Sequence, residues 1–204
     1  METIAFIKDE ASLAAHYGTP GAASTQKVAR RITPEYRAYI EAAPFFALAT
    51  VGPEGLDCSP RGDVAPAVAI QDEGTLLIPD RKGNNRIDSL RNIVRDPRVA
   101  LMLMVPGAPT IVRINARAGV SADESLRARF CREGALPRTV IVVEISEIYF
   151  QCARALMRAG LWDGLPPRTD LPTPGEILDA QTQSAIDGAA YDAAWPARAA
   201  RSMW

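Results

Sequence analysis

Closely spaced β-prone runs constrain the fold of this chain more than any other feature of its sequence. Apolar, β-prone runs occur at residues 45–51, 75–78, 99–105, 110–120 and 139–148. A parallel sheet needs a crossover connection of about a dozen or more residues between strands, and most of these runs lie too close together for one. No Gly-x-Gly-x-x-Gly turn follows any run, which argues against a doubly wound nucleotide-binding sheet. The pattern predicts a mainly β fold, a small antiparallel barrel of about six or seven strands with helices outside it.

The first of these runs is expected to form a hairpin. Residues 45–51 and 56–59 flank a turn at 52–55 that contains two glycines and a proline. The segment 59–63 then interrupts the second strand before residues 65–70 resume it, and a bulge at that point would direct Arg61 toward a ligand. The alternative is that Arg61 and Asp63 pair with each other, or with solvent, in a loop.

The segment from residue 75 to residue 99 is predicted to form a strand, a polar turn and a short helix. Pro79 ends the strand, and the turn covers residues 80–84. Asn85 is the expected N-cap of the helix, and Asp96-Pro97 ends it. Apolar residues at helical spacing form the expected buried face: Ile87, Leu90, Ile93 and Val94.

The start of this helix is a candidate anion site. The first helical turn leaves backbone N–H groups unpaired and carries the positive end of the helix dipole. Arg81, Lys82 and Arg86 lie close to that start, and Gly83 allows the backbone to approach a ligand. Since Arg can bind a phosphate through two parallel hydrogen bonds, the segment predicts a phosphate site. The alternative is a set of solvated surface residues that happen to precede a helix.

Composition argues against several other classes of protein. Lys plus Arg (23) nearly balances Asp plus Glu (24), so the basic surface of a nucleic-acid-binding protein is not expected. No apolar run approaches the roughly 20 residues of a membrane span, and the first residues lack the pattern of a signal peptide, so a cytoplasmic protein is expected. Three cysteines far apart and a single histidine, His16, suggest no disulfide framework, no metal site and no histidine-based catalysis.

The ends of the chain are expected to be helical additions to the barrel. Residues 1–43 form a mostly polar N-terminal segment with helices at 9–17, at 24–32 and from Thr33-Pro34 onward. The barrel domain covers residues 44–163 and includes helices at 121–130, with Ser121 and Glu124 as a capping box, and at 149–161. Residues 164–204 form a Pro-rich linker and an amphipathic tail. The apolar face of such a tail must pack either on the barrel of the same chain or on a second subunit.

A series of short motifs resembles the FMN-binding flavoproteins related to pyridoxamine 5'-phosphate oxidase. The motifs occur in order over about residues 34–163: FALAT at 46–50, DCSPRGD at 57–63, LIPDR at 77–81, GNNRIDSLRNI at 83–93, DP at 96–97, VRINAR at 112–117 and FQCAR at 150–154. The resemblance implies a split β-barrel and a homodimer that holds two FMN molecules at the subunit interface.

The resemblance also assigns cofactor-binding residues. The FMN phosphate would be bound by Arg81, Lys82, Asn85, Arg86 and Ser89. The ribityl chain and the edge of the isoalloxazine ring would lie along Ser59, Arg61, Pro79 and Asp80. Arg154 and Trp162 would come from the other subunit.

The sequence also departs from the family in places. Arg154 stands where relatives tend to carry Lys, and Ala116 where they carry Gly. Pyridoxamine phosphate oxidases also use a His near the C-terminus to bind substrate, and this chain has no His beyond His16. We therefore expect an FMN-dependent oxidoreductase for an unknown small molecule, with no assigned catalytic side chain, and not a pyridoxal phosphate synthase. The alternatives are a flavin-binding electron carrier and the same fold with a deazaflavin; haem is disfavoured because the barrel carries no His.

Overall fold

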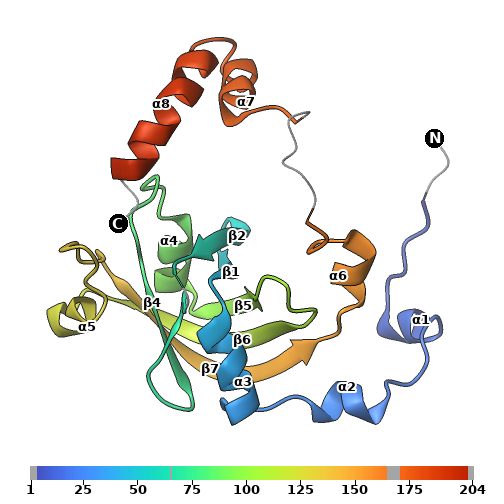
Figure 1. The fold of residues 1–204 in the computed structure, drawn as a ribbon. Helices are drawn as coiled ribbons and strands as arrows, with labels where there is room; N and C mark the ends of the chain where they lie inside the picture. Colours follow the sequence, from blue (N-terminus) through green and yellow to red (C-terminus); the bar gives the residue numbers. More distant parts are fainter. Residues whose placement is uncertain (1–3, 65, 165–170, 202–204) are drawn as a thin grey trace.

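In a computed structural model that describes residues 4–64, 66–164 and 171–201, the strands form one curved antiparallel sheet (Figure 1). The seven strands have the order β2-β1-β5-β6-β7-β4-β3. Their bounds are β1 (Phe45–Gly52), β2 (Gly55–Gly62), β3 (Ala69–Ile70), β4 (Thr75–Pro79), β5 (Arg98–Met104), β6 (Ile111–Ser121) and β7 (Val140–Gln151). The predicted mainly β fold with flanking helices is confirmed.

The hairpin of β1 and β2 is also confirmed, but the expected interruption of its second strand is wrong. Pairing runs without a break from Gly52 and Gly55 to Phe45 and Gly62, so no bulge lies at Arg61. Pro60 fits inside β2 because β2 is an edge strand, where a missing N–H need not break the ladder.

The strand expected at residues 65–70 is much shorter than predicted. Residue 65 lies outside the described residues, and of residues 66–70 only Ala69 and Ile70 pair, with Leu77 and Leu76 of β4. The backbone N–H of Ala67 donates instead to the carbonyl of Ala43, at the end of helix α3 (Pro34–Ala42). That contact removes the segment before β3 from the sheet.

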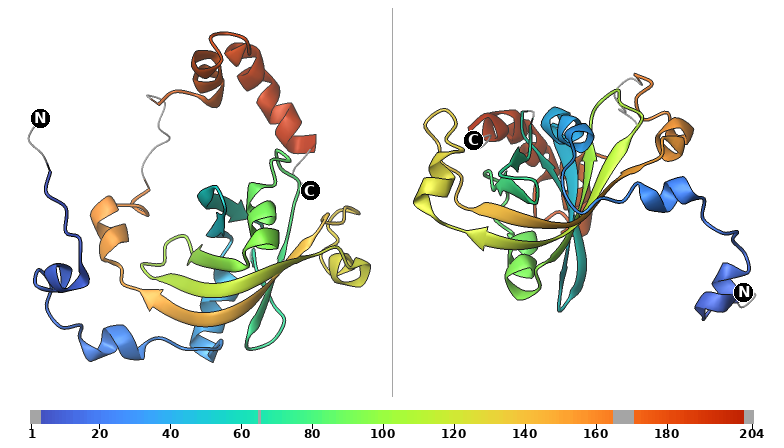
Figure 2. Two further views of the ribbon diagram at one scale, coloured as in Figure 1. Left: turned by 180° about the vertical axis from the view of Figure 1, so that it is seen from behind. Right: turned by 90° about the horizontal axis from the view of Figure 1, so that it is seen from below.

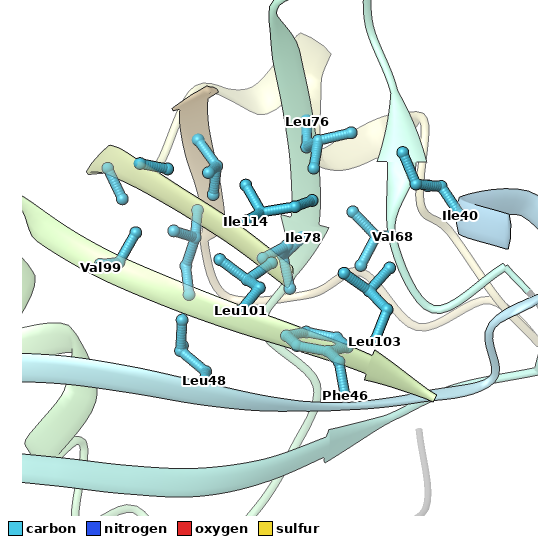
Figure 3. Close-up of a cluster of buried hydrophobic side chains, with 14 of the residues drawn as sticks. Ile40, Phe46, Leu48, Val68, Leu76, Ile78, Val99, Leu101, Leu103 and Ile114 are labelled. Atoms are coloured by element: carbon cyan, nitrogen blue, oxygen red, sulfur yellow. The ribbon is translucent and has the colours of Figure 1, made fainter. Parts of the chain in front are cut away.

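The core lies on one face of the sheet, where alternate residues of successive strands meet (Figure 3). In β6 burial alternates along the strand: Val112, Ile114, Ala116 and Ala118 are buried, whereas Arg113 and Arg117 are exposed. Ile40 of α3 adds to the same core. Burial of such side chains is the main force that holds the barrel together.

Helix α4 (Asp88–Arg95) differs from the prediction in its start and in its buried face. Asn85 is not the N-cap; Ile87 takes that place in the left-handed conformation, with φ 54° and no side-chain cap. Ser89, Asn92 and Ile93 are buried, whereas Val94 is 75% exposed. The face turns this way because Asn92 Nδ2 donates to Thr50 Oγ1 of β1 at 3.1 Å, so polar residues face the sheet with their hydrogen bonds satisfied.

Other helix boundaries are set by neighbouring contacts. Thr33 caps α3, so this helix begins where the sequence predicts. Helix α5 (Glu124–Ala128) is capped by Asp123 and not by Ser121, because the Asp123 carboxylate accepts from the Leu126 N–H at 2.9 Å. Helix α6 (Arg154–Ala159) begins later than expected, because β7 continues to Gln151 by pairing with Ile111.

Helical segments precede and follow the barrel (Figures 1 and 2). Helices α1 (Glu10–Ala14) and α2 (Ala22–Gln26) bury no residue. Helices α7 (Pro174–Gln181) and α8 (Gly188–Arg201) pack against each other, and α7 begins at a capping box formed by Thr173 and Glu176. The expected Pro-rich linker lies partly outside the described residues, as do residues 202–204 of the tail. Among the helices described, none has the length and hydropathy that a membrane span requires.

Candidate functional site

The candidate site begins where the core ends, at the edge strand β2. Residues that pair directly across an antiparallel ladder lie on the same face of the sheet. Phe46, Leu48 and Thr50 of β1 lie on the core face, and their partners on β2 are Arg61, Ser59 and Asp57. On this face of the sheet, mainly apolar side chains on β1 therefore give way to polar side chains on the neighbouring strand, β2.

These β2 residues border a cavity of about 870 Å³. Its other walls come from the end of β4, the turn that follows it, the first turn of α4 and the residues before β7. Phe46, Ala67, Ile78 and Leu90 supply apolar surface. An apolar wall combined with a few converging polar groups is typical of sites for small molecules and cofactors, and the volume lies in their usual range.

Most of the predicted cofactor-binding residues line this cavity. They are Ser59, Arg61, Pro79, Asp80, Arg81, Lys82, Asn85, Arg86 and Ser89. Arg154 and Trp162 do not line it within one chain. Arg154 begins α6, and Trp162 Nε1 donates to the carbonyl of Ala108 at 3.0 Å. Their assignment to the site of a second subunit stays a prediction.

A chain of hydrogen bonds crosses the floor of the cavity. Arg61 Nε donates to Ser59 Oγ at 3.3 Å, and Ser59 Oγ lies 3.1 Å from Ser89 Oγ. The Ser89 hydroxyl donates its one proton to Asp57 Oδ2 at 2.8 Å, so the Ser59 hydroxyl must donate to Ser89. Arg61 Nη1 also donates to Asp80 Oδ1 at 2.8 Å. The chain joins β2 to α4 and to the end of β4, and it fixes the orientation of both hydroxyl groups.

A second set of polar contacts involves Asp63 and Arg81, which also line the cavity. Arg81 Nε donates to Asp63 Oδ2 at 2.8 Å, and Arg81 Nη1 donates to the carbonyl of Phe130 at 2.8 Å. Arg132 Nη1 lies 3.4 Å from the other oxygen of Asp63, whose side chain is 7% exposed. Arg61 and Asp63 thus pair with different residues, and the alternative that they pair with each other is wrong.

The turn before α4 is more open. Asn85 adopts the left-handed conformation with φ 61°, and its side-chain oxygen accepts from Arg138 Nη1 at 2.9 Å. Arg86 Nε donates to Asp88 Oδ2 at 2.8 Å, and both side chains are substantially exposed. Lys82 is exposed at the same turn. The local geometry concentrates positive charge at one end of the cavity, where a phosphate would be favoured.

Asp57, Arg138 and Thr139 also line the cavity, and the sequence interpretation missed them. Asp57 could have been found from the two-residue period that it shares with Ser59 and Arg61. No local pattern identifies Arg138 and Thr139. They reach the cavity because β4 pairs with β7 and the Asp80 N–H donates to the carbonyl of Thr139 at 2.9 Å.

Comparison with known proteins connects this chain to a described family. A model of the family described as pyridoxamine 5'-phosphate oxidase matches residues 32–152. HupZ of Group A Streptococcus is similar in structure, with a TM-score of 0.50 and 15% sequence identity over 59% of this chain and 94% of HupZ. A Lactobacillus delbrueckii structure that carries the same family description has a TM-score of 0.49 and 23% identity over 59% of this chain and 95% of its own. No curated protein matches the chain significantly. At these identities the structural likeness to HupZ supports the fold alone.

Proposed function

The chain belongs to the pyridoxamine 5'-phosphate oxidase family and has a split β-barrel fold; from this premise we propose that its cavity binds FMN and that the protein is an oxidoreductase for a small molecule. The observation that carries the proposal is the convergence of the predicted cofactor-binding residues on one cavity between β2 and α4. The cavity combines a cationic end with apolar wall, as a phosphate joined to a flat ring requires.

The residues of the cavity fit this cofactor in chemistry. Arg81, Lys82, Asn85, Arg86 and Ser89 would bind the phosphate, which is a dianion best held by charge-assisted hydrogen bonds. Ser59, Arg61, Pro79 and Asp80 would lie along the ribityl chain and the ring edge. When bound, FMN supplies the electron-transfer chemistry, and the protein supplies binding, orientation and electrostatics. Arg61, held by Asp80 and Ser59, would place positive charge near the ring.

The sheet supports a proposal about assembly. On the face of β1 and β5 that points away from the core, the paired residues are small or apolar: Phe45 with Met104, Ala47 with Met102 and Ala49 with Ala100. Phe45 and Met102 are 39% and 38% exposed. A partly exposed apolar sheet face suits an isologous contact with a second copy of the chain. We propose a homodimer in which Arg154 and Trp162 of each subunit approach the other subunit's cavity.

The nature of the substrate is limited by the residues that the chain lacks. No His follows His16, so the substrate-binding His of pyridoxamine phosphate oxidases has no counterpart. We propose a reaction other than pyridoxal phosphate synthesis. Location in the cytoplasm, without nucleic-acid partners, remains an expectation from the sequence.

The absorption spectrum of the freshly purified protein tests the cofactor. We expect a flavin spectrum, with FMN identified by mass after heat release. Release of a deazaflavin instead would keep the site but change the cofactor. A colourless protein that takes up no added FMN would contradict the proposal and leave the family resemblance to describe the fold alone. A flavin-loaded protein that is reduced but passes electrons to no small molecule would favour an electron carrier.

A further inference from the structure

The cationic side chains that line the cavity are not equally neutralised. Arg61 pairs with Asp80, Arg81 with Asp63 and Arg86 with Asp88, each at 2.8 Å. Lys82 and Arg138 also line the cavity, and no carboxylate of the described residues lies within ion-pair distance of either. The uncompensated charge of the cavity therefore lies at the ends of two neighbouring strands, after β4 and before β7.

Arg138 is held at this position by a neutral partner. Its Nη1 donates to Asn85 Oδ1 at 2.9 Å, and an amide oxygen leaves the guanidinium charge available. A guanidinium has five N–H donors in a planar fork, so one bond to Asn85 leaves others for a ligand.

The next residue provides an independent observation. Thr139 Oγ1 is buried and has no hydrogen-bond partner among the described residues, although Thr139 lines the cavity. A buried hydroxyl without a partner is uncommon in folded proteins and often marks a group that a ligand or water satisfies. The backbone of Thr139 is tied to the turn by the bond from the Asp80 N–H to its carbonyl.

We propose that Arg138 binds a phosphate monoester in the cavity, and that rotation of the Thr139 side chain brings its unpaired hydroxyl to the same phosphate. The inference rests on the proposed function, in which the phosphate of FMN is the favoured source; the phosphate of a second, phosphorylated ligand is the other. Lys82, in the turn after β4, also lines the cavity, so cations from the segments after β4 and before β7 would approach one phosphate. Arg81, whose Nε and Nη1 donate to Asp63 and Phe130, would hold the turn in place.

The affinity for FMN compared with that for riboflavin isolates the phosphate contribution. Arg138→Gln should weaken FMN binding by about tenfold to a hundredfold, the usual effect of losing one charge-assisted hydrogen bond. Riboflavin binding should stay unchanged, because riboflavin has no phosphate. Arg138→Lys should recover part of the loss, since it restores the charge. Arg129→Gln is the matched control: Arg129 also donates to a neutral amide, Gln71, at 2.6 Å, and does not line the cavity.

Inorganic phosphate provides a second probe that does not depend on flavin. It should raise the melting temperature of the wild-type protein and should do so less in Arg138→Gln. Unchanged FMN affinity in Arg138→Gln, with loss of phosphate stabilisation in the FMN-loaded protein, would support the inference and assign the phosphate to a second ligand. If the wild-type protein binds no flavin, the proposed function fails, and phosphate stabilisation of the flavin-free protein still decides the role of Arg138.

Two results would overturn the inference. Equal losses of FMN and riboflavin affinity in Arg138→Gln would show that Arg138 only supports the turn through Asn85. Unchanged FMN affinity together with unchanged phosphate stabilisation would show that no phosphate contacts it.

Discussion

Asp63 connects three separate segments through one carboxylate. It accepts from Arg81 at the end of β4 and from Arg132 beyond α5, while its own side chain is only 7% exposed. Removing one partner from a buried ion pair is costly, because it leaves the other charge desolvated and unpaired. The architecture of the cavity wall therefore depends on this residue.

Asp63→Asn should lower the free energy of unfolding by about 3 kcal/mol, since it removes the carboxylate from a largely buried ion pair with Arg81. Urea unfolding followed by circular dichroism measures the change. Glu73→Gln is a suitable control, because Glu73 pairs with Arg31 where both side chains are well exposed, and its loss should cost less than about 1 kcal/mol. An equal decrease in the free energy of unfolding in the two variants would show that the burial of Asp63 does not make its ion pair more important for stability.

The residues of the cavity were predictable to the extent that they lie in contiguous segments. Arg81, Lys82 and Arg86 stand within a few positions of one another, so the sequence alone places them together. Arg138 and Thr139 are far away in the chain and reach the cavity through the pairing of β4 with β7. No periodicity within one segment contains that information, because strand pairing is a non-local property.

Strands were predicted better than helix termini for a physical reason. In β6, one face contacts the core along its length, so burial follows the two-residue period directly. In α4, polar Ser89 and Asn92 are buried because Asp57 and Thr50 provide hydrogen bonds to them, and apolar Val94 is left in solvent. A prediction that places every polar residue of a helix in solvent cannot anticipate hydrogen-bond partners that lie on another strand.

The junction between α4 and β5 has a charge-dependent contact. Asp96, the C-cap of α4, accepts from the side chain of Arg98 at 2.6 Å and from its backbone N–H at 3.0 Å. The side-chain hydrogen bond from Arg98 is the main cause that lowers the pKa of Asp96 to about 2, from an ordinary 3.8. Because the folded protein holds this carboxylate ionised more strongly than the unfolded chain does, the contact stabilises the fold above about pH 4.

Comparison of the wild-type protein with Asp96→Asn should show this dependence. The difference in unfolding free energy is expected to be constant above about pH 4, and to shrink as the pH falls from about 4 to about 2, where Asp96 becomes protonated in the wild type as well. Unfolding curves at several pH values measure it. A difference that persists in full at pH 2 would mean that the carboxylate charge is not the source of the stabilisation.

The proposed homodimer makes the outer face of the sheet a test of assembly. Ala49 lies on β1 opposite Ala100, on the face that points away from the core. Ala49→Glu should place a charge in the contact and shift the protein to a monomer, since burial of an unpaired charge is strongly unfavourable. Analytical ultracentrifugation should then report a single chain of 22.0 kDa and not twice that mass.

The same variant tests whether the cavity is shared. If Arg154 and Trp162 of the second subunit contribute to the site, the monomer should also bind FMN more weakly. Val94→Glu is the control, because Val94 is 75% exposed on α4 and away from that face, so this variant should remain a dimer. A dimer that survives Ala49→Glu would place the interface elsewhere.

The open pairing order of the sheet leaves two outer strands, and each is poorly suited to recruiting strands from other molecules. One is β2, where Pro60 has no N–H to donate and therefore interrupts any row of donors offered to a foreign strand. The other is β3, which is only two residues long. Short or proline-containing borders are a common protection against uncontrolled aggregation. The barrel can thus expose an apolar face for the proposed dimer contact without also promoting fibre-like growth.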